Sequence, residues 1–221
     1  MDIDEFRKHG HHLIDWMADY MDTVEKLPVR SQVKPGKIAS LLKEKPPTNG
    51  EPMGNIIDDF KTNILPGVTH WQHPSFFAYF PANSSPPSVL AEMLTATLGA
   101  QCMLWQTSPA ATEMETRMME WLASMINLPQ KFSGVIQDSA SSATLCALLT
   151  AREQATSWKT NKSGFMKVSK KLIVYTSEEA HSSTEKGAKI AGFGRDNIRF
   201  IPTDNKFRMR ASLLRQKIQL D

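Results

Sequence analysis

Small hydroxyl residues lie between a β-branched run and an Ala/Leu-rich helical run in the stretch GVIQDSASSATLCALLTARE, at residues 134–153. This pattern predicts a strand, a tight turn at residues 139–142 and the start of a long helix. Such a turn points unpaired backbone N–H groups and hydroxyls toward one place in front of the positive end of the helix, where a phosphate binds well. The same residues would also suit an ordinary helix with a serine cap.

A single histidine, His181, follows the next β-branched run, which spans residues 171–176. An imidazole near a phosphate site can stack on a planar heteroaromatic cofactor or act as an acid or base. A histidine in this place can also do no more than cap the following helix.

Aromatic residues gather in a third stretch, between Trp71 and Phe80, where five of them lie close to several prolines. Proline forbids a regular helix or a central strand, so these rings are expected on irregular backbone. Such a cluster suits a pocket for an apolar ligand, since the rings supply area and the loop supplies placement. It would equally suit a hydrophobic contact that joins neighbouring helices to the main core.

The elements that must position these residues follow from hydrophobic periodicity. After residue 130, strand and helix patterns alternate: strands at 171–176 and 198–202, and helices at 182–191 and from about 210. This alternation predicts an α/β fold with a parallel sheet covered by helices. Ligands bind at the carboxyl ends of such strands, where both the hydroxyl-rich turn and the loop before His181 should lie.

The amino-terminal part is expected to be helical, with helices at about residues 4–26, 38–43 and 55–64. Together they carry more apolar surface than they can enclose, so they should pack on the rest of the chain or on a second subunit. A further helix at 88–104 is apolar on most sides and is therefore expected to be buried.

Composition narrows the classes of function. The net charge of +3 is spread along the 221 residues without a basic stripe, which disfavours nucleic-acid binding. No apolar run is long enough for a membrane span, and acidic residues open the chain where a secretory signal would need basic ones, so a soluble cytoplasmic protein is expected. Cys102 and Cys146 lie outside any metal-ligand spacing and are expected to be buried free thiols, so no metal site is predicted.

Four segments, HPSFFAYFPANSS, SPAATEMETRMMEWL, GVIQDSASSATLCALLTARE and AHSSTEKGAKIAG, occur in an order and spacing that closely resemble the pyridoxal-phosphate-dependent aromatic-L-amino-acid decarboxylases of the group II decarboxylase family. The resemblance covers nearly all of the chain. It implies a fold-type-I enzyme, a carbon–carbon lyase that works as a tight homodimer with its site at the subunit interface. Residues 1–85 would form a helical segment that clasps the partner subunit and shapes the substrate pocket, and residues 86–221 would begin the large cofactor-binding domain.

The same resemblance assigns roles to individual residues. Ser139, Ala140 and Ser141 match the turn that holds the phosphate of pyridoxal 5'-phosphate, with Ala140 acting through its backbone. His181 matches the catalytic histidine that stacks over the pyridine ring and faces the substrate. The residues that match the substrate pocket are Trp71, Tyr79, Phe80, Pro81, Ala82 and Met103, the last in the part lent by the neighbouring subunit.

Some positions depart from the family pattern. Many relatives have threonine at the position of Ala82, and animal members carry an aromatic residue at Met103, so the preferred ring size stays open. Asp138 stands where animal members have glycine, and its carboxylate is expected to point away from a bound phosphate. The family's cofactor-binding lysine and pyridine-pairing aspartate match no residue up to Asp221, so this chain is expected to be the amino-terminal portion of a longer enzyme, with the carboxyl-terminal part absent.

The expected reaction is decarboxylation of an aromatic L-amino acid (tryptophan, tyrosine, phenylalanine or a hydroxylated form) to the amine and CO2. One alternative is a related enzyme that acts on histidine or glutamate or that forms an aldehyde. Another is a truncated product without catalysis that only dimerises.

Overall fold

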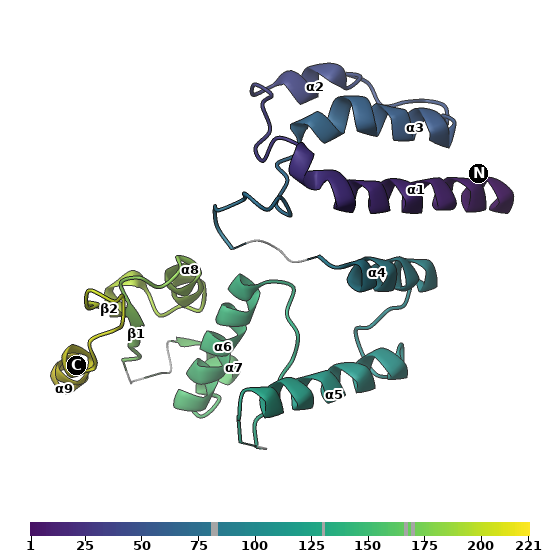
Figure 1. Cartoon of the computed structure of the whole chain (residues 1–221). Helices are drawn as coiled ribbons and strands as arrows, with labels where there is room; N and C mark the ends of the chain where they lie inside the picture. The colour runs from purple at the N-terminus through teal and green to yellow at the C-terminus, as the bar shows by residue number, and fades with distance from the viewer. Residues whose placement is uncertain (81–83, 130, 166–167, 169–170) are drawn as a thin grey trace. The chain divides into compact units, whose positions relative to one another are not determined.

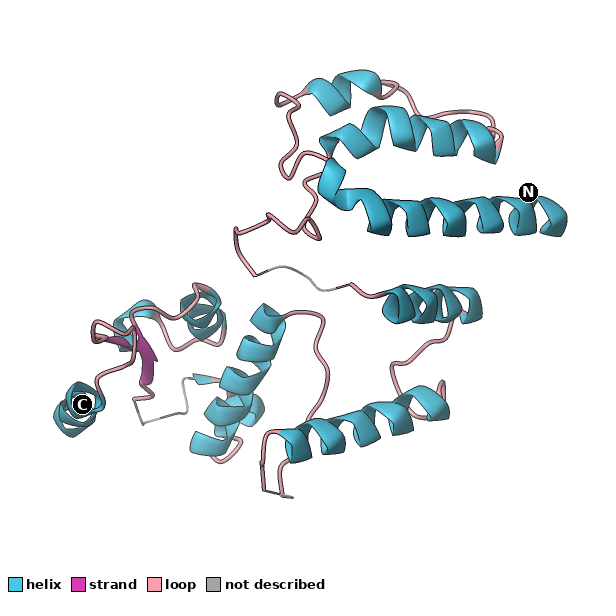
Figure 2. Cartoon of the chain, in the orientation of Figure 1, coloured by secondary structure: helices cyan, strands magenta, loops and turns pink. Residues whose placement is uncertain are grey.

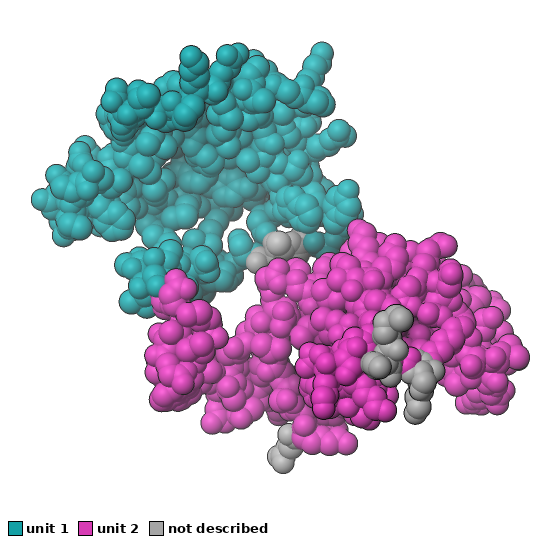
Figure 3. Space-filling view, turned by 180° about the vertical axis from the view of Figure 1, so that it is seen from behind, with its two compact units in different colours: residues 1–99 teal, residues 100–221 magenta. Residues whose placement is uncertain are grey.

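A computed structural model of the chain describes residues 1–80, 84–129, 131–165, 168 and 171–221. The chain divides into two compact units, residues 1–99 and residues 100–221 (Figure 3). The boundary predicted at residue 85 separates a dimerisation segment from the cofactor-binding domain. It describes function and not compact units, and it stays a prediction. Among the residues described, none of the helices combines the length and the apolar character that spanning a bilayer would require.

The amino-terminal unit begins with the long helix α1 (Ile3–Thr23), which continues as the 3-10 turn η1 (Val24–Lys26). Asp2 caps this helix: its carboxylate accepts a hydrogen bond from the Glu5 amide at 2.8 Å, and the Glu5 side chain accepts one from the Asp2 amide at 3.2 Å. This reciprocal capping box satisfies amides that the helix start leaves without partners. The helix predicted at residues 4–26 is confirmed.

Shorter helical segments follow: α2 (Lys37–Leu41), α3 (Met53–Asp59), the π-helical turn η2 (Phe60–Ile64) and the 3-10 turn η3 (Leu65–Gly67). Helices α1 and α3 lie side by side (Figure 1). An aromatic contact joins α1 to η2, which directly continues α3: Trp16 lies edge-on to Phe60 with ring centroids 5.4 Å apart. Ile57 on α3 is buried within the amino-terminal unit.

Helix α4 (Pro86–Leu98) is the last element of this unit and is capped by Ser85. It ends because Gly99 takes the left-handed φ of +58°, which stops the helix before the predicted end near residue 104. The prediction that this helix is buried is wrong within this chain, because the described residues leave its leucines exposed: Leu90, Leu94 and Leu98.

The second unit contains the sheet and its covering helices (Figure 2). Its elements in chain order are α5 (Pro109–Met125), α6 (Ala140–Ala155), α7 (Lys159–Ser163), β1 (Val174–Ser177), α8 (Ser183–Ile190), η5 (Arg195–Asn197), β2 (Ile198–Ile201) and α9 (Ala211–Leu220). Strands β1 and β2 pair in parallel, with Val174 opposite Ile198 and Ser177 opposite Ile201. The predicted parallel pairing, with helices between successive strands, is confirmed.

The core of this unit lies where α6 and α8 meet the sheet. Ala188 and Ala191 are fully buried there. A Cβ added at Gly187 would lie 3.2 Å from Cδ1 of Leu148 and 3.7 Å from the backbone of Leu145. Glycine therefore allows α6 and α8 to approach more closely than a larger residue would.

Two local predictions are wrong. The stretch 134–136 forms no strand, since the described residues offer it no neighbouring strand, and the Ile136 amide donates instead to the Glu115 carboxylate on α5 at 2.7 Å. A strand is stable only when its backbone groups pair. Cys102, predicted to be buried, is exposed, and Cys146 is partly buried.

A buried ion pair closes the carboxyl-terminal end of α6. Arg152 donates to Glu153 Oε1 at 2.8 Å from Nη2 and to the Ala191 carbonyl at 2.8 Å from Nη1. The second oxygen of Glu153 accepts the Asn161 amide of α7 at 3.0 Å, and the Arg152 guanidinium lies 5.3 Å from the centre of the Phe165 ring. The pair therefore joins α6 to α7 and to the end of α8.

We expect Arg152→Met to lower the free energy of unfolding by about 2–4 kcal/mol, because it leaves the buried Glu153 carboxylate without its cation. Urea unfolding of the native protein measures this. The double variant Arg152→Met/Glu153→Leu should lose less than the single variants added together, since it removes both charges.

The control is Glu120→Gln, which breaks the exposed Arg117–Glu120 pair of α5. It should change the stability by less than about 1 kcal/mol. Equal losses in Arg152→Met and in this control would contradict a structural role for the buried pair.

Candidate active site

The hydroxyl-rich turn is the start of helix α6. Ser139 is the N-cap with extended backbone (φ −155°, ψ 161°), and its Oγ accepts a hydrogen bond from the Ser142 amide at 3.2 Å. The Ser139 and Ser142 hydroxyls are 3.1 Å apart. The alternative of an ordinary serine cap is thus part of the structure, and it accounts for one of the first amides of the helix.

The cap leaves the next amides available to a ligand. Within the described residues, the N–H groups of Ala140 and Ser141 donate to no protein acceptor. Both residues are exposed, and the first turn of α6 contains no acidic residue that would neutralise its positive end. The start of α6 therefore fits a phosphate group. The one carboxylate nearby in the sequence is that of Asp138, directly before the cap.

His181 lies in the loop that leads from β1 into α8. Its Nδ1 accepts a hydrogen bond from the Ser183 amide at 3.2 Å and lies 3.0 Å from the Ser183 hydroxyl. Since an amide only donates, Nδ1 carries no proton in this geometry, and the neutral ring carries its proton on Nε2. The loop itself is fixed by the Ala180 amide, which donates to the Ser177 carbonyl at 3.0 Å.

Helix packing brings these two loops into one unit. The turn at Ser139 begins α6 and His181 precedes α8, and the two helices contact each other at Gly187. No hydrogen bond or ring contact among the described residues joins His181 directly to residues 139–141. The relation between the two loops therefore depends on the helices behind them.

The aromatic loop, residues 71–80, lies in the amino-terminal unit. Trp71 stacks on Tyr79 with ring centroids 5.8 Å apart and 16° between the ring planes, and it lies 4.8 Å from the Phe76 ring. Tyr79 has a φ of +58°, a left-handed conformation that is unfavourable for a residue with a Cβ. Tyr79 and Phe80 are almost fully exposed, so their rings are free to contact a ligand.

The remaining predicted pocket residues are not tested by the structure. Pro81 and Ala82 lie outside the described residues. Met103 is exposed and belongs to the unit of residues 100–221, while the aromatic loop belongs to the unit of residues 1–99. The roles of all these residues stay predictions.

Sequence reasoning missed the histidines that hold the aromatic loop. His70 is buried, and its Nδ1 lies 2.8 Å from the Tyr20 hydroxyl of α1. His73 contacts the Glu25 carbonyl of η1 through Nε2 at 3.1 Å. The only signal in the sequence is their position directly beside the aromatic cluster, because each partner lies about fifty residues earlier.

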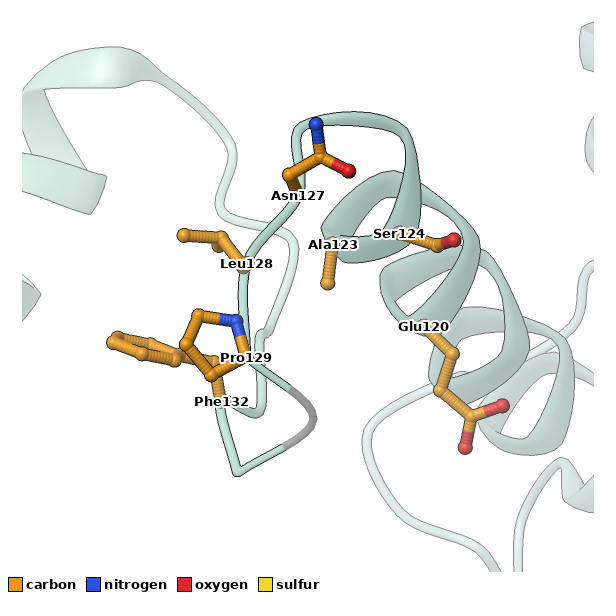
Figure 4. A pocket seen from close by; sticks show the side chains of 7 residues that line it. All are labelled: Glu120, Ala123, Ser124, Asn127, Leu128, Pro129 and Phe132. Atoms are coloured by element: carbon orange, nitrogen blue, oxygen red, sulfur yellow. The ribbon is translucent and has the colours of Figure 1, made fainter.

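A cavity of about 620 Å3 lies at the carboxyl-terminal end of α5 (Figure 4). Glu120, Ala123 and Ser124 of the helix and the following segment with Leu128 and Pro129 line it. No predicted site residue that the structure describes lines it, and its described lining lacks the convergent donors of the α6 turn. We therefore place the candidate site at the loops and not at this cavity.

Comparison with protein families gives a match over residues 35–221 to the pyridoxal-dependent decarboxylase conserved domain. The chain is 42% identical to phenylacetaldehyde synthase of Arabidopsis thaliana over 229 residues and 43% identical to aromatic-L-amino-acid decarboxylase of Mus musculus over 235 residues. Both alignments cover 100% of this chain, but only 46% and 48% of those proteins. The chain spans about half the length of these curated relatives.

Among solved structures, the fold is similar to that of Catharanthus roseus tryptophan decarboxylase in complex with L-tryptophan, with a TM-score of 0.89 and 38% sequence identity. The match covers 99% of this chain and 46% of that protein. The predicted fold class is confirmed by this similarity.

The buried histidine of the aromatic loop gives the stability of the protein a specific pH dependence. Burial lowers the pKa of His70 below its ordinary value of 6.5, and repulsion from His73 adds to the effect. Burial also raises the pKa of Tyr20, so its hydroxyl keeps its proton. As the pH falls below the ordinary histidine value, the unfolded chain takes up a proton that folded His70 resists, and the stability declines.

Urea unfolding between about pH 7 and pH 5 should therefore show a steeper loss of stability in the wild-type protein than in His70→Gln. The control His11→Gln removes an exposed histidine of α1 and should keep the wild-type slope. Parallel stability curves for wild type and His70→Gln would contradict the burial of a neutral histidine.

Proposed function

The chain belongs to the pyridoxal-dependent decarboxylase family, and we propose that the native protein uses pyridoxal 5'-phosphate to decarboxylate an aromatic L-amino acid. The observation that carries this proposal is the start of α6, where exposed amides without protein acceptors follow a serine cap and no acid occupies the first turn. That arrangement suits the phosphate of the cofactor. The similarity to a decarboxylase of aromatic amino acids supports the choice of substrate.

Ser139, Ala140 and Ser141 would hold the cofactor phosphate. The amides of Ala140 and Ser141 donate to it, and the Ser141 hydroxyl can add a further hydrogen bond. When bound, the cofactor supplies an electron sink for the electron pair that remains as the substrate carboxylate leaves as CO2.

His181 would lie against the cofactor ring and face the substrate. The Ser183 amide fixes the ring through Nδ1, so the proton at Nε2 and the flat face of the imidazole remain for ligands. A neutral ring held in this way stacks on a planar group and presents one donor at a defined atom. Its task is to orient the reacting groups and to hold or transfer a proton.

The aromatic loop would bind the side chain of the substrate. The stacked Trp71 and Tyr79 offer flat apolar area, and the exposed Phe80 lies beside them in sequence. The further residues proposed for this pocket are Pro81, Ala82 and Met103. Rings of this kind favour an aromatic substrate over an acidic one, because an unpaired carboxylate side chain would lose its hydration against them.

We propose a homodimer with the active site at the subunit interface, in the cytoplasm. Apolar residues of α1 and α4, among them Ile3, Phe6 and Leu94, are exposed within this chain. A groove of about 420 Å3 between the two helices is lined in part by Phe6 and Met93. Such a continuous apolar surface supports a covering partner, either a second subunit or a further part of a longer protein.

A second candidate function is an aldehyde-forming reaction. The chain is 42% identical to a phenylacetaldehyde synthase and 43% identical to a decarboxylase, so sequence identity supports the two functions equally. Analysis of products separates the two: a decarboxylase forms the amine and CO2 without an oxidant, whereas an aldehyde synthase also needs an oxidant such as O2 and forms the aldehyde, CO2, ammonia and hydrogen peroxide. A non-catalytic dimerising fragment would form neither.

The native protein with added cofactor should release CO2 and amine from L-tryptophan, L-tyrosine or L-phenylalanine. His181→Ala should keep its fold and lose roughly 100-fold or more of this rate, the size of effect typical of a group that positions or transfers a proton. The control Lys186→Ala changes an exposed residue of the following helix α8 and should retain the rate. Normal turnover in His181→Ala would remove His181 from the site.

Ser141→Leu should weaken retention of the cofactor by about 1.5–3 kcal/mol, the strength of a hydrogen bond to a charged group. Equilibrium dialysis, followed by the visible absorbance of the cofactor, measures this without any turnover. Thr150→Val on the same helix removes a hydroxyl whose bond among the described residues goes to the Cys146 carbonyl, and it should have no effect. Equal retention in Ser141→Leu and wild type would show that the phosphate binds elsewhere.

A further inference from the structure

Two histidines connect the aromatic loop to the end of the first helix. His70 directly precedes Trp71 and is 4% exposed, and its ring centroid lies 5.6 Å from that of Tyr20. The Tyr20 hydroxyl lies 2.8 Å from Nδ1 of His70, and the His70 amide donates to the Val29 carbonyl at 2.9 Å. Backbone and side chain of His70 are thus both fixed by the segment at the end of α1.

His73 makes the second connection, three residues further along. The Ser75 amide donates to its Nδ1 at 2.9 Å, so the ring proton lies on Nε2. Nε2 therefore donates to the Glu25 carbonyl at 3.1 Å. This histidine joins the turn that leads into the exposed aromatic residues to the backbone of η1.

The rest of the loop has few contacts of this kind. Beyond residue 75, the described contacts of its rings are those of Phe76 and Tyr79 with Trp71, within the loop itself. Phe77 and Phe80 are at least 90% exposed. Among the described contacts, those of His70 and His73 thus connect the start of the loop to α1, to the Val29 carbonyl and to η1.

We propose that Tyr20, His70 and His73 are positioning residues that hold the aromatic loop in its ligand-binding conformation and so determine the affinity for the aromatic substrate. This inference rests on the proposed function of the loop. None of the three needs to touch the substrate, since each acts through the Trp71–Tyr79 stack. The amino-terminal helix α1 thereby takes part in substrate selection.

The test compares Tyr20→Phe with wild type in the native protein. The variant removes one hydroxyl and keeps the ring that stacks on Trp16 at 5.5 Å. Hydrogen exchange of the amides of residues 71–80 should become about five-fold faster, the effect of one net hydrogen bond. The KM for the aromatic amino acid should rise by a similar factor, while kcat stays within about two-fold because the reacting groups are unchanged.

Three further variants sharpen this test. His70→Asn keeps an acceptor near the place of Nδ1 and should restore part of the wild-type KM, whereas His70→Ala should not. Tyr20→Phe/His70→Ala should exchange no faster than His70→Ala alone, because both changes remove the same bond. Thr23→Val is the matched control: it removes a hydroxyl of α1 that, in the described part of the chain, donates to the Asp19 carbonyl.

Unchanged exchange of residues 71–80 in Tyr20→Phe, or full additivity in the double variant, would overturn the proposal. Faster exchange with an unchanged KM would also overturn it, because the loop would then move without effect on the substrate. If the wild-type protein turns over no aromatic amino acid, the proposed function fails while the exchange measurement still decides whether the histidines anchor the loop.

Discussion

The close contact between α6 and α8 is the constraint on which the candidate active site depends. Gly187 permits it, since a Cβ there would come within 3.2 Å of Leu148. Each helix starts at a loop that carries predicted site residues, Ser139 before α6 and His181 before α8. Packing along the helices thus relates two loops that share no direct hydrogen bond among the described residues. At the opposite end of α6, the buried Arg152–Glu153 pair fixes the helix to its neighbours.

Electrostatics at the start of α6 favours an anion despite the carboxylate of Asp138. An exposed charge at about 4 Å in water repels an anion by roughly 1 kcal/mol. Each amide that donates to a charged group contributes about 1.5–3 kcal/mol. Because Ser139 caps only the Ser142 amide, the amides of Ala140 and Ser141 are both available, and together they outweigh the repulsion.

Features set by neighbouring residues could be predicted from the sequence, and features set by distant partners could not. The hydroxyl-rich turn, the parallel strands and the helix after His181 follow from local patterns of side chains. The strand expected at 134–136 is absent because a strand needs a paired neighbour, which no local pattern supplies. Whether Leu98 is covered, and which residue His70 bonds to, likewise depend on partners that are distant in sequence. For the candidate site, the phosphate turn could therefore be predicted from the sequence, but the anchoring of the aromatic loop could not.

The conformation of the aromatic loop shows why such anchors are needed. Tyr79 in the left-handed region costs about 1–3 kcal/mol. Its stacking on Trp71 returns only about 0.5–1.5 kcal/mol, and the exposed rings bury little area that would add to this. The loop would therefore relax if these internal contacts were all that held it. The Tyr20–His70 and His73–Glu25 hydrogen bonds tie the start of the loop to α1 and η1 and limit the conformations open to the residues that follow. In the proposed site, a substrate that meets rings already stacked would lose less entropy on binding than one that must order them, and helix α1 would then contribute to recognition without contacting the ligand.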